Sequence, residues 1–322
     1  MMLSVCLLSA ALAAEPVFPL ETKSVSLVFA RSERGVWRLP YVGKSVGAKE
    51  DVLTLEGQKK RYHGDTDHPS YGIYGAPLLG MDSDKFGGLA VKHADGSLVS
   101  DLEAVGAEPK EIADEPGVRH IVLPMKDRRT PFFVDQHFRA DAASDVIETW
   151  IEIRHEEASA VELLRMDSFA WSMPRLARAY TLHSLASWWG NEGQLSSAPL
   201  AKSQALTINS RNGVRGAWDA NPAFMLSVGP RADERSGTVI GGALAWSGAW
   251  RISAQHDYAD LLELRKYAVI RQVATDHHAV RAPGVELAQH LLERLGRSRI
   301  DDVDVGDHAE AELFRAKPRR PV

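Results

Sequence analysis

Two adjacent tryptophans stand among glycine, amide and carboxylate residues in the segment 182–213. The run is Trp188-Trp189-Gly190-Asn191-Glu192-Gly193-Gln194. A regular strand would bury one indole and push the other into water, so a loop that presents an aromatic platform is the better interpretation. Such a platform suits a sugar ring, whose C–H face stacks on indole while its hydroxyls need donors and acceptors. Both rings could instead cap a hydrophobic core, and composition leaves the two interpretations open.

A pair of acids, Asp65 and Asp67, precedes the run His68-Pro69-Ser70-Tyr71-Gly72. Two carboxyl groups that flank a sugar could perform glycosidase chemistry. Acids at this spacing are also common in loops, which favours sugar hydrogen bonding or plain turn structure.

Three further patterns lack the context that their chemistry needs. The string Gly43-Lys44-Ser45-Val46-Gly47 fits a nucleophile elbow, but no helical pattern follows it. Asp82-Ser83-Asp84 begins like a calcium loop, yet Phe86 stands where the third ligand belongs. His277-His278 has no metal-ligand spacing to other candidates. The sequence therefore predicts no catalytic residue among these motifs, no metal site and no cofactor.

The composition indicates a globular protein large enough for one big domain or two ordinary ones. The chain has 322 residues, of which 44% are hydrophobic and 25% charged. A net charge of -5 provides no basic surface for nucleic acid, which we exclude as a partner.

Residues 1–14 form a short apolar run that ends in Ala11-Leu12-Ala13, as in a signal peptide. The run is too short to span a bilayer, so we predict export to the periplasm or medium and no membrane anchor. Without such a signal the protein would be cytoplasmic. Cys6, the single cysteine, lies inside this run and leaves the remainder without thiol chemistry.

The middle of the chain has the residue pattern of many consecutive β-strands. Within 145–154, Ile147, Thr149, Ile151 and Ile153 occupy one face and charged residues the other, which is typical of a half-buried antiparallel strand. Short β-branched or aromatic runs separated by turn signals predict strands at Val25–Ala30, Val36–Val42, Gly88–His93, Val118–Met125, Phe132–Arg139, Val146–Arg154, Val161–Ala170, Ala179–His183, Gln204–Asn209, Ala223–Val228, Thr238–Trp246 and Trp250–Gln255. So many strands without intervening helices predict an all-β fold, a large antiparallel β-sandwich.

The character changes after about residue 260. Val285–Leu295 has apolar residues at helical spacing, so we predict an amphipathic helix there and a short helical or disordered tail over 261–322. The β-sandwich is expected to occupy residues 20–260.

Several strings occur in an order that resembles the start of the family 36 glycoside hydrolases, the microbial α-galactosidases. They cover roughly residues 20–260 and are Leu27-Val28-Phe29-Ala30, His68-Pro69-Ser70-Tyr71-Gly72, His93-Ala94-Asp95-Gly96-Ser97, Asp145-Val146-Ile147-Glu148-Thr149-Trp150, Trp189-x-x-Glu192-x-Gln194, Ser210-Arg211-Asn212-Gly213, Asn221-Pro222-Ala223-Phe224 and Leu244-Ala245-Trp246-Ser247-Gly248-Ala249-Trp250-Arg251.

This resemblance implies a galactose-mutarotase-like β-supersandwich, which in the family precedes a catalytic barrel with two aspartates. It implies α-galactosides of the raffinose type as substrates and a homo-oligomer. Trp189 is the implied stacking residue and Trp188 the second choice, and the loop with Asp65 and Tyr71 is implied to approach the sugar.

The sequence after Trp250-Arg251 departs from the family pattern, and we find no barrel or catalytic aspartates in it. We therefore expect a truncated α-galactosidase-like protein, with a shifted reading frame or a gene truncation near 255–265 as the hypothesis for its origin. We expect it to be inactive alone, to help close the galactoside pocket and to support oligomer assembly. The alternative is a stand-alone carbohydrate-binding or scaffold protein.

Overall fold

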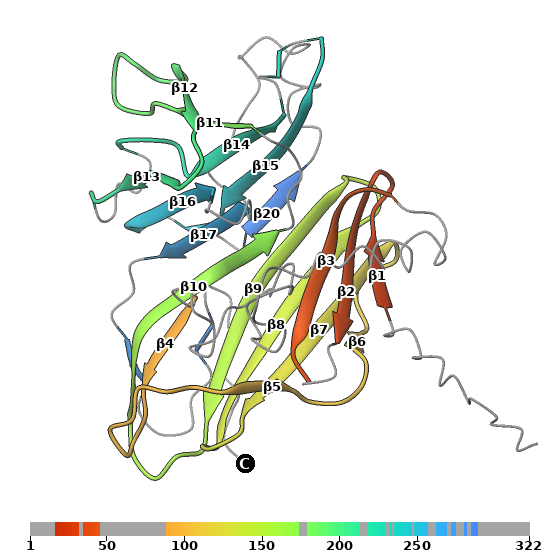
Figure 1. The fold of residues 1–322 in the computed structure, drawn as a ribbon, viewed down its shortest axis with the longest axis vertical. Coiled ribbons are helices and arrows are strands. Elements are labelled where there is room, and N and C mark those ends of the chain that lie inside the picture. The colour runs from red at the N-terminus through yellow and green to blue at the C-terminus, as the bar shows by residue number, and fades with distance from the viewer. Residues whose placement is uncertain are drawn as a thin grey trace, which may run out of the picture.

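The computed structural model describes residues 17–31, 35–45, 88–173, 179–212, 218–229, 232–233, 235–246, 248–256, 262–268, 272–274, 280–281 and 285–288. Every regular element in these residues is a β-strand (Figure 1). The predicted all-β fold class is therefore confirmed.

The described strands form three antiparallel sheets. The three-stranded sheet has the order β1-β2-β3, built from Val17–Glu21, Val25–Arg31 and Trp37–Lys44. The six-stranded sheet has the order β13-β16-β17-β10-β18, with β4 also paired to β10, and comprises Gln204–Ser210, Trp250–His256, Leu262–Ala268, Val161–Met173, Gln272–Ala274 and Leu89–Lys92.

The eleven-stranded sheet has the order β12-β11-β14-β15-β20-β9-β8-β7-β5, with β19 paired to β9 and β6 to β7. Its strands, in that order, are Leu195–Leu200, Tyr180–Leu185, Ala223–Val228, Thr238–Leu244, Val285–Ala288, Val146–His155, Phe132–Asp141, Val118–Asp127, Leu102–Ala104, Val280–Arg281 and Lys110–Ile112. This sheet carries the segment with the paired tryptophans at one end.

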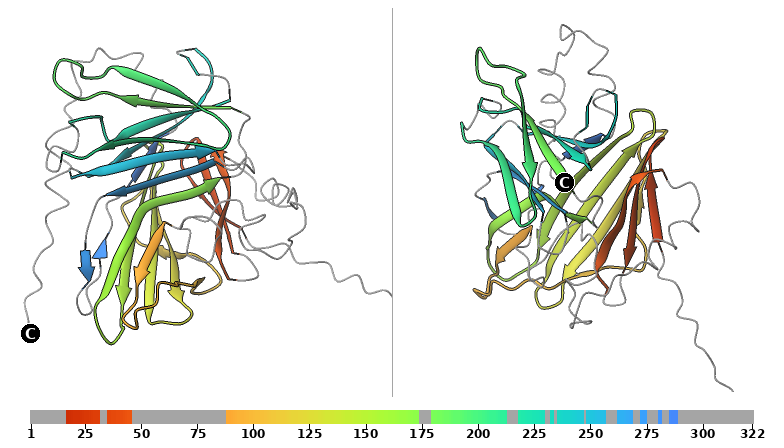
Figure 2. Two further views of the ribbon diagram at one scale, coloured as in Figure 1. Left: turned by 60° about the vertical axis from the view of Figure 1, so that its left-hand side comes forward. Right: turned by 45° about the horizontal axis from the view of Figure 1, so that its top comes forward.

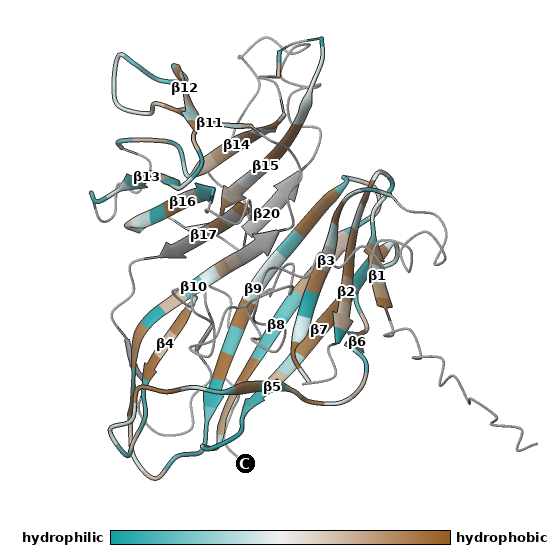
Figure 3. Ribbon diagram, in the orientation of Figure 1, coloured by the Kyte–Doolittle hydropathy of each residue, from teal (hydrophilic) through white to brown (hydrophobic). Residues whose placement is uncertain are grey.

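The strands β7, β8 and β9 form a long meander whose side chains alternate between two faces. Ile147, Thr149, Ile151 and Ile153 on β9 are at most 2% exposed, which confirms the predicted inward face. The banding of apolar and polar residues along these strands is visible in Figure 3. Period-two alternation on neighbouring strands produces one continuous apolar face, which a second layer must cover.

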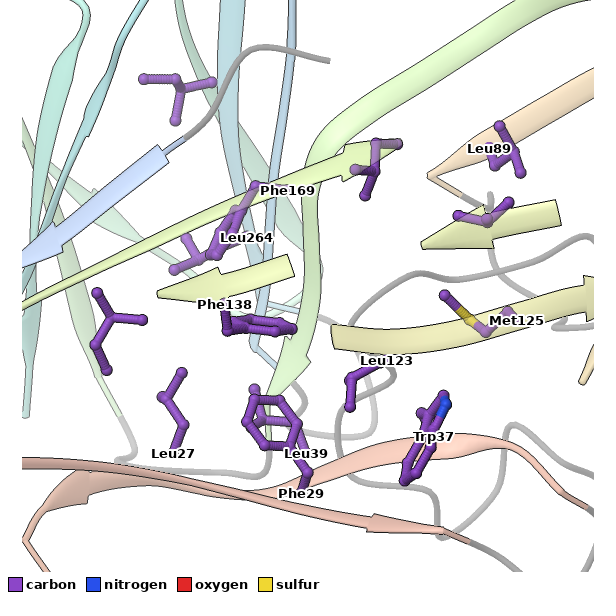
Figure 4. Packing of buried hydrophobic residues seen from close by; sticks show 14 of the residues in the cluster. Leu27, Phe29, Trp37, Leu39, Leu89, Leu123, Met125, Phe138, Phe169 and Leu264 are labelled. Atoms are coloured by element: carbon purple, nitrogen blue, oxygen red, sulfur yellow. The ribbon is translucent and has the colours of Figure 1, made fainter. Parts of the chain in front are cut away.

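That second layer is the sheet of β1, β2 and β3, which lies against the meander (Figures 1, 2 and 4). The Phe29 and Phe138 rings meet with centroids 4.7 Å apart, and both side chains are fully buried. The indole N–H of Trp37 donates to the carbonyl of Pro124 at 3.3 Å. Aromatic burial of this kind supplies much of the free energy that holds two β-layers together.

Hydrogen bonds between Asp145 and Ser24 join a turn of the meander to a turn of the three-stranded sheet. Asp145, at the β8–β9 turn, adopts a left-handed backbone with φ of 58°. Its carboxylate accepts hydrogen bonds from the backbone N–H of Ser24 at 2.8 Å and from the Ser24 hydroxyl at 2.7 Å. Asp tolerates this conformation better than most residues, and the two bonds compensate for its cost.

The predicted helix at Val285–Leu295 is wrong for its first four residues. Val285–Ala288 form β20, which pairs with β15 on one side and β9 on the other. Insertion between two strands satisfies the backbone groups of this short apolar run better than an isolated helical turn would. Residues 289–295 lie outside the described part of the chain.

Strand pairing continues past residue 260, where the sequence suggested that the sandwich would end. Strand β17 lies between β16 and β10 and pairs with each over six or more residues. Among the described residues, none forms a helix of the length and apolarity that a bilayer crossing requires.

Candidate functional site

The paired tryptophans lie in the loop of the β11–β12 hairpin. The two strands pair from Tyr180↔Leu200 to Leu185↔Leu195 without a register shift. The ladder continues into the loop, where Ala186 donates to the Gln194 carbonyl and Gly193 donates back to the Ala186 carbonyl, each at 2.9 Å. The hairpin therefore holds the loop by regular strand pairing at its base.

A β-turn at the tip places Trp189 at a corner. The N–H of Asn191 donates to the carbonyl of Trp188 at 3.0 Å, which closes a four-residue turn. Gly190 has a φ of 80° in the third position of this turn, as a type II turn requires. Glycine adopts this conformation without the steric cost that a Cβ would bring, so the turn directs Trp189 outward.

Both indoles are exposed rather than buried in a core. The Trp189 side chain is 85% exposed and that of Trp188 52%. The expectation of a loop that presents these rings agrees with the structure. That they bind sugar stays a prediction.

A third exposed tryptophan lies on the segment that runs beside this hairpin. Trp218 is 44% exposed. The segment is attached by a bridge between Ala186 and Ala220 and by the N–H of Asn221, which donates to the Leu185 carbonyl at 3.0 Å. The sequence did not indicate this neighbour, because the contact joins residues 34 positions apart with no local signal.

A buried histidine braces the strands under the loop. His183 on β11 hydrogen-bonds the hydroxyl of Ser197 on β12 at 2.8 Å and that of Ser227 on β14 at 2.7 Å. One ring thus joins three neighbouring strands, and because buried polar groups need partners it fixes their lateral order. The brace makes the base of the hairpin rigid, while the loop above it faces solvent.

The loop combines apolar rings with groups that donate and accept hydrogen bonds. Glu192 and Gln194 are exposed beside the indoles, and Asn191 is partly exposed. This set can cover the apolar face of a planar or pyranose ring and bind its hydroxyls. The chemistry that these side chains offer is stacking and hydrogen bonding.

Two predicted site residues, Asp65 and Tyr71, lie outside the described residues, as do the whole Asp82–Asp84 run and the last two residues, Val46 and Gly47, of the Gly43–Gly47 string. The structure therefore shows only the tryptophan part of the predicted site. In the described part of the chain, no group of three or more His, Cys, Asp or Glu side chains is arranged to hold a metal ion.

A serine, a histidine and a glutamate form a triad-like chain elsewhere in the fold. His93 contacts Glu157 Oε1 through Nδ1 at 2.7 Å and the Ser100 hydroxyl through Nε2 at 3.0 Å. Ser100 is only 1% exposed, and Glu157 Oε2 also accepts the N–H of Ala94 at 2.8 Å. A nucleophile needs access to substrate, so this buried chain braces the turn that follows β4.

A row of titratable side chains crosses the outer face of β7, β8 and β9. His120 lies 3.3 Å from Asp114 and 3.0 Å from His137, whose ring stacks on Trp150 with centroids 4.7 Å apart. The hydrogen bond from Arg139 holds the pKa of the Asp114 carboxyl below its usual value. The two histidine side chains are 11% and 9% exposed, so the row stabilises the sheet and offers little room to a ligand.

The strand order, the hairpin and its aromatic loop can now be compared with known proteins. The sequence model of the glycosyl hydrolase family 36 N-terminal domain matches residues 38–265. The chain belongs to this family. The match includes the β11–β12 hairpin and the segment that carries Trp218.

Solved structures of family 36 enzymes have the same fold as this domain. The α-galactosidase from Lactobacillus brevis aligns with a TM-score of 0.72 and 18% identity, over 86% of this chain and 39% of that enzyme. A variant of the Geobacillus stearothermophilus α-galactosidase AgaA in complex with stachyose aligns with a TM-score of 0.71 and 18% identity, over 85% of this chain and 40% of that one.

Another AgaA variant, solved with raffinose, gives a TM-score of 0.72 at 18% identity over 85% of this chain and 40% of its own. This chain therefore spans about two fifths of the length of these enzymes. A search of curated protein sequences found no match.

Proposed function

We propose that this family 36 domain contributes the β11–β12 loop to an α-galactoside-binding pocket and supports assembly of a homo-oligomer. Trp189 is the stacking residue, with Trp188 as the second. The observation that carries the proposal is the position of Trp189 at the corner of a glycine-dependent turn, 85% exposed. A large indole held in water has no role in the core, which favours a role in contact with a ligand.

The loop is organised to bind with little loss of conformational freedom. Strand pairing at the base and the Trp188–Asn191 turn at the tip already fix the backbone before a ligand arrives. A preorganised ring loses less entropy on binding than a ring on a disordered segment. Stachyose and raffinose are present in two of the similar solved structures, which favours galactosides of this type as the substrate class.

The domain binds but does not cleave in this proposal. Retaining glycoside hydrolysis needs two carboxyl groups about 5–5.5 Å apart on either side of the scissile bond. Of the acids on these segments, Glu192 lies in the loop and Asp219 follows Trp218 on the neighbouring segment. We therefore assign catalysis to groups outside the described residues.

A second candidate is a stand-alone carbohydrate-binding or scaffold domain. The exposure of three tryptophans, Trp188, Trp189 and Trp218, on adjoining segments favours it, because one surface of this chain then offers several rings. A pocket shared with other residues would give millimolar affinity from this domain alone. A complete binding site would reach the micromolar range.

Calorimetric titration of the chain with stachyose tests the proposal. Trp189→Ala is expected to weaken binding about tenfold, since an indole that covers a sugar face contributes about 1.5 kcal/mol. Leu195→Ala is the matched control, because Leu195 is 55% exposed in the strand pair next to the same loop and has no ring. Equal affinity of the Trp189→Ala variant and the unmodified chain would contradict the stacking role.

A further inference from the structure

Strand β13, Gln204–Ser210, is the last strand of the six-stranded sheet and has a partner on one side only within the described residues. It pairs with β16 over all seven of its residues without a bulge. Its remaining backbone groups form a row that can accept another strand. Gln204, Ala205 and Thr207 are exposed along it.

The other long sheet edges carry features that prevent such pairing. Strand β1 contains Pro19, whose carbonyl accepts a hydrogen bond from Arg119 at 2.6 Å. Strand β3 contains Pro40 and Lys44, and β12 contains Pro199. The edge strands β4, β5, β6 and β18 have only three or four residues each. Proline, lysine and short length are the common means of blocking edge-to-edge association.

Strand β13 has none of these protections. Its sequence is Gln-Ala-Leu-Thr-Ile-Asn-Ser, with no proline and no charged residue. Leu206 and Ile208 pack against the core, whereas Thr207 between them faces outward. An unprotected edge of this length in a chain that protects its other edges indicates a surface meant for pairing.

The sequence of β13 is complementary to itself when two copies run antiparallel. With Thr207 on the two-fold axis, Leu206 faces Ile208 of the second copy on the core side of the sheet. On the outer side, Thr207 faces Thr207 and Ala205 faces Asn209. Apolar and Thr–Thr cross-strand pairs are favourable, and no like charges meet. In this register the core-facing sides of the two sheets lie on the same side of the joined sheet, and so do their solvent-facing sides.

We infer that β13 is the docking edge through which two copies of this chain form a symmetric dimer, with their six-stranded sheets joined antiparallel across Thr207. The inference deepens the assembly role proposed above and is independent of sugar binding. Pairing of identical edges gives a closed two-fold contact. One pair of seven-residue strands buries less than a standard interface, so the expected dissociation constant is roughly 1–100 μM.

Sedimentation velocity of the full chain between about 5 and 200 μM tests the dimer. The unmodified chain is expected to shift from monomer to dimer. Thr207→Lys places two ammonium groups opposite each other on the axis and is expected to weaken association at least about thirtyfold. Thr207→Glu should do the same, and an equimolar mixture of the two variants should dimerise again. Ser196→Lys, on the proline-protected edge β12, is the control that should leave the dimer intact.

Disulfide trapping tests the register. In a Cys6→Ser background, Thr207→Cys brings two thiols face to face, at a Cα separation of about 4.5–5.5 Å that a disulfide can span. Asn209→Cys instead faces Ala205 of the second copy and places the thiols about 13 Å apart. Oxidation should cross-link the first variant and not the second.

Two results would overturn the inference. One is a chain that stays monomeric at about 200 μM, and the other is a dimer that survives Thr207→Lys, which would locate the interface elsewhere. Stachyose titration and sedimentation of both variants separate the β13 dimer from the role of the loop in sugar binding. Thr207→Lys should keep its affinity for stachyose, and Trp189→Ala should still form the dimer.

Discussion

Replacement of Gly190 by alanine should damage the aromatic loop without disturbing the core. Gly190 has a φ of 80°, and a Cβ added there would meet no atom within 4 Å. The substitution therefore introduces backbone strain and no clash. For an L-residue the left-handed conformation costs about 1–2 kcal/mol, which is the upper limit of the expected effect.

Part of this strain can be relieved locally. The loop is exposed, and the Trp188–Asn191 turn can change type while the ladder below Ala186 remains paired. We therefore expect the midpoint of thermal unfolding to fall by about 2–4 °C, the shift that about 1 kcal/mol produces in a domain of this size. Trp189 would leave the turn corner, and the affinity for stachyose should fall about fivefold.

Differential scanning calorimetry and stachyose titration measure the two effects separately. Gly237→Ala is the matched control, since Gly237 also has a positive φ, of 115°, but its added Cβ would lie 2.5 Å from Ala232 Cβ. That variant should lose more stability and keep its sugar affinity. Unchanged stachyose affinity in the Gly190→Ala variant would refute the claim that this turn presents the sugar-binding ring.

Three other substitutions probe the scaffold. Phe138→Ala should cost about 3–5 kcal/mol in urea unfolding, because a fully buried ring against Phe29 is removed. Glu157→Ala should cost about 3 kcal/mol in the same assay, because the buried His93 ring loses its carboxylate partner. A loss below about 1 kcal/mol would contradict the claim that Glu157 braces the turn after β4. Burial, and then the charge of Glu152, raise the pKa of Asp135, so the ionised form is disfavoured in the folded state. The stability that this group contributes therefore falls as the pH rises from its unfolded-state pKa of about 3.9 through the raised folded-state pKa. Asp135→Asn should raise the unfolding temperature by about 1–2 °C at pH 7 and leave it unchanged at about pH 3. No gain at pH 7 would contradict the assignment.

Local pattern was sufficient to predict the longest strands of this fold, but it missed the seven-residue strand β17, which the sequence placed in the tail. The Ile147–Ile153 alternation and the turn signals around it depend on side-chain period, which the sheet preserves. The short strands β5, β6, β18 and β19 have two or three residues each and no period to detect. Strand β20 has helical spacing in sequence, but pairing with β15 and β9 determines its conformation.

The candidate site was predictable only where its residues are adjacent in sequence. Trp188 and Trp189 are recognisable as a loop because glycine and amides follow them. Trp218 joins them through the Ala186–Ala220 bridge, which depends on how β11 and β14 pair. The free edge of β13 likewise depends on sheet order, because its sequence alone is that of an ordinary strand.

Saturation-transfer NMR of the chain with stachyose tests the central claim most directly. If the β11–β12 loop binds the sugar as proposed, the terminal galactose should receive the strongest saturation, on the C–H face that stacks on an indole. The signal should fall severalfold in the Trp189→Ala variant, in line with the expected roughly tenfold loss of affinity, and persist in the Leu195→Ala variant. Saturation that is absent from the unmodified chain, or that is unchanged by Trp189→Ala, would contradict the assignment of this loop to galactoside binding.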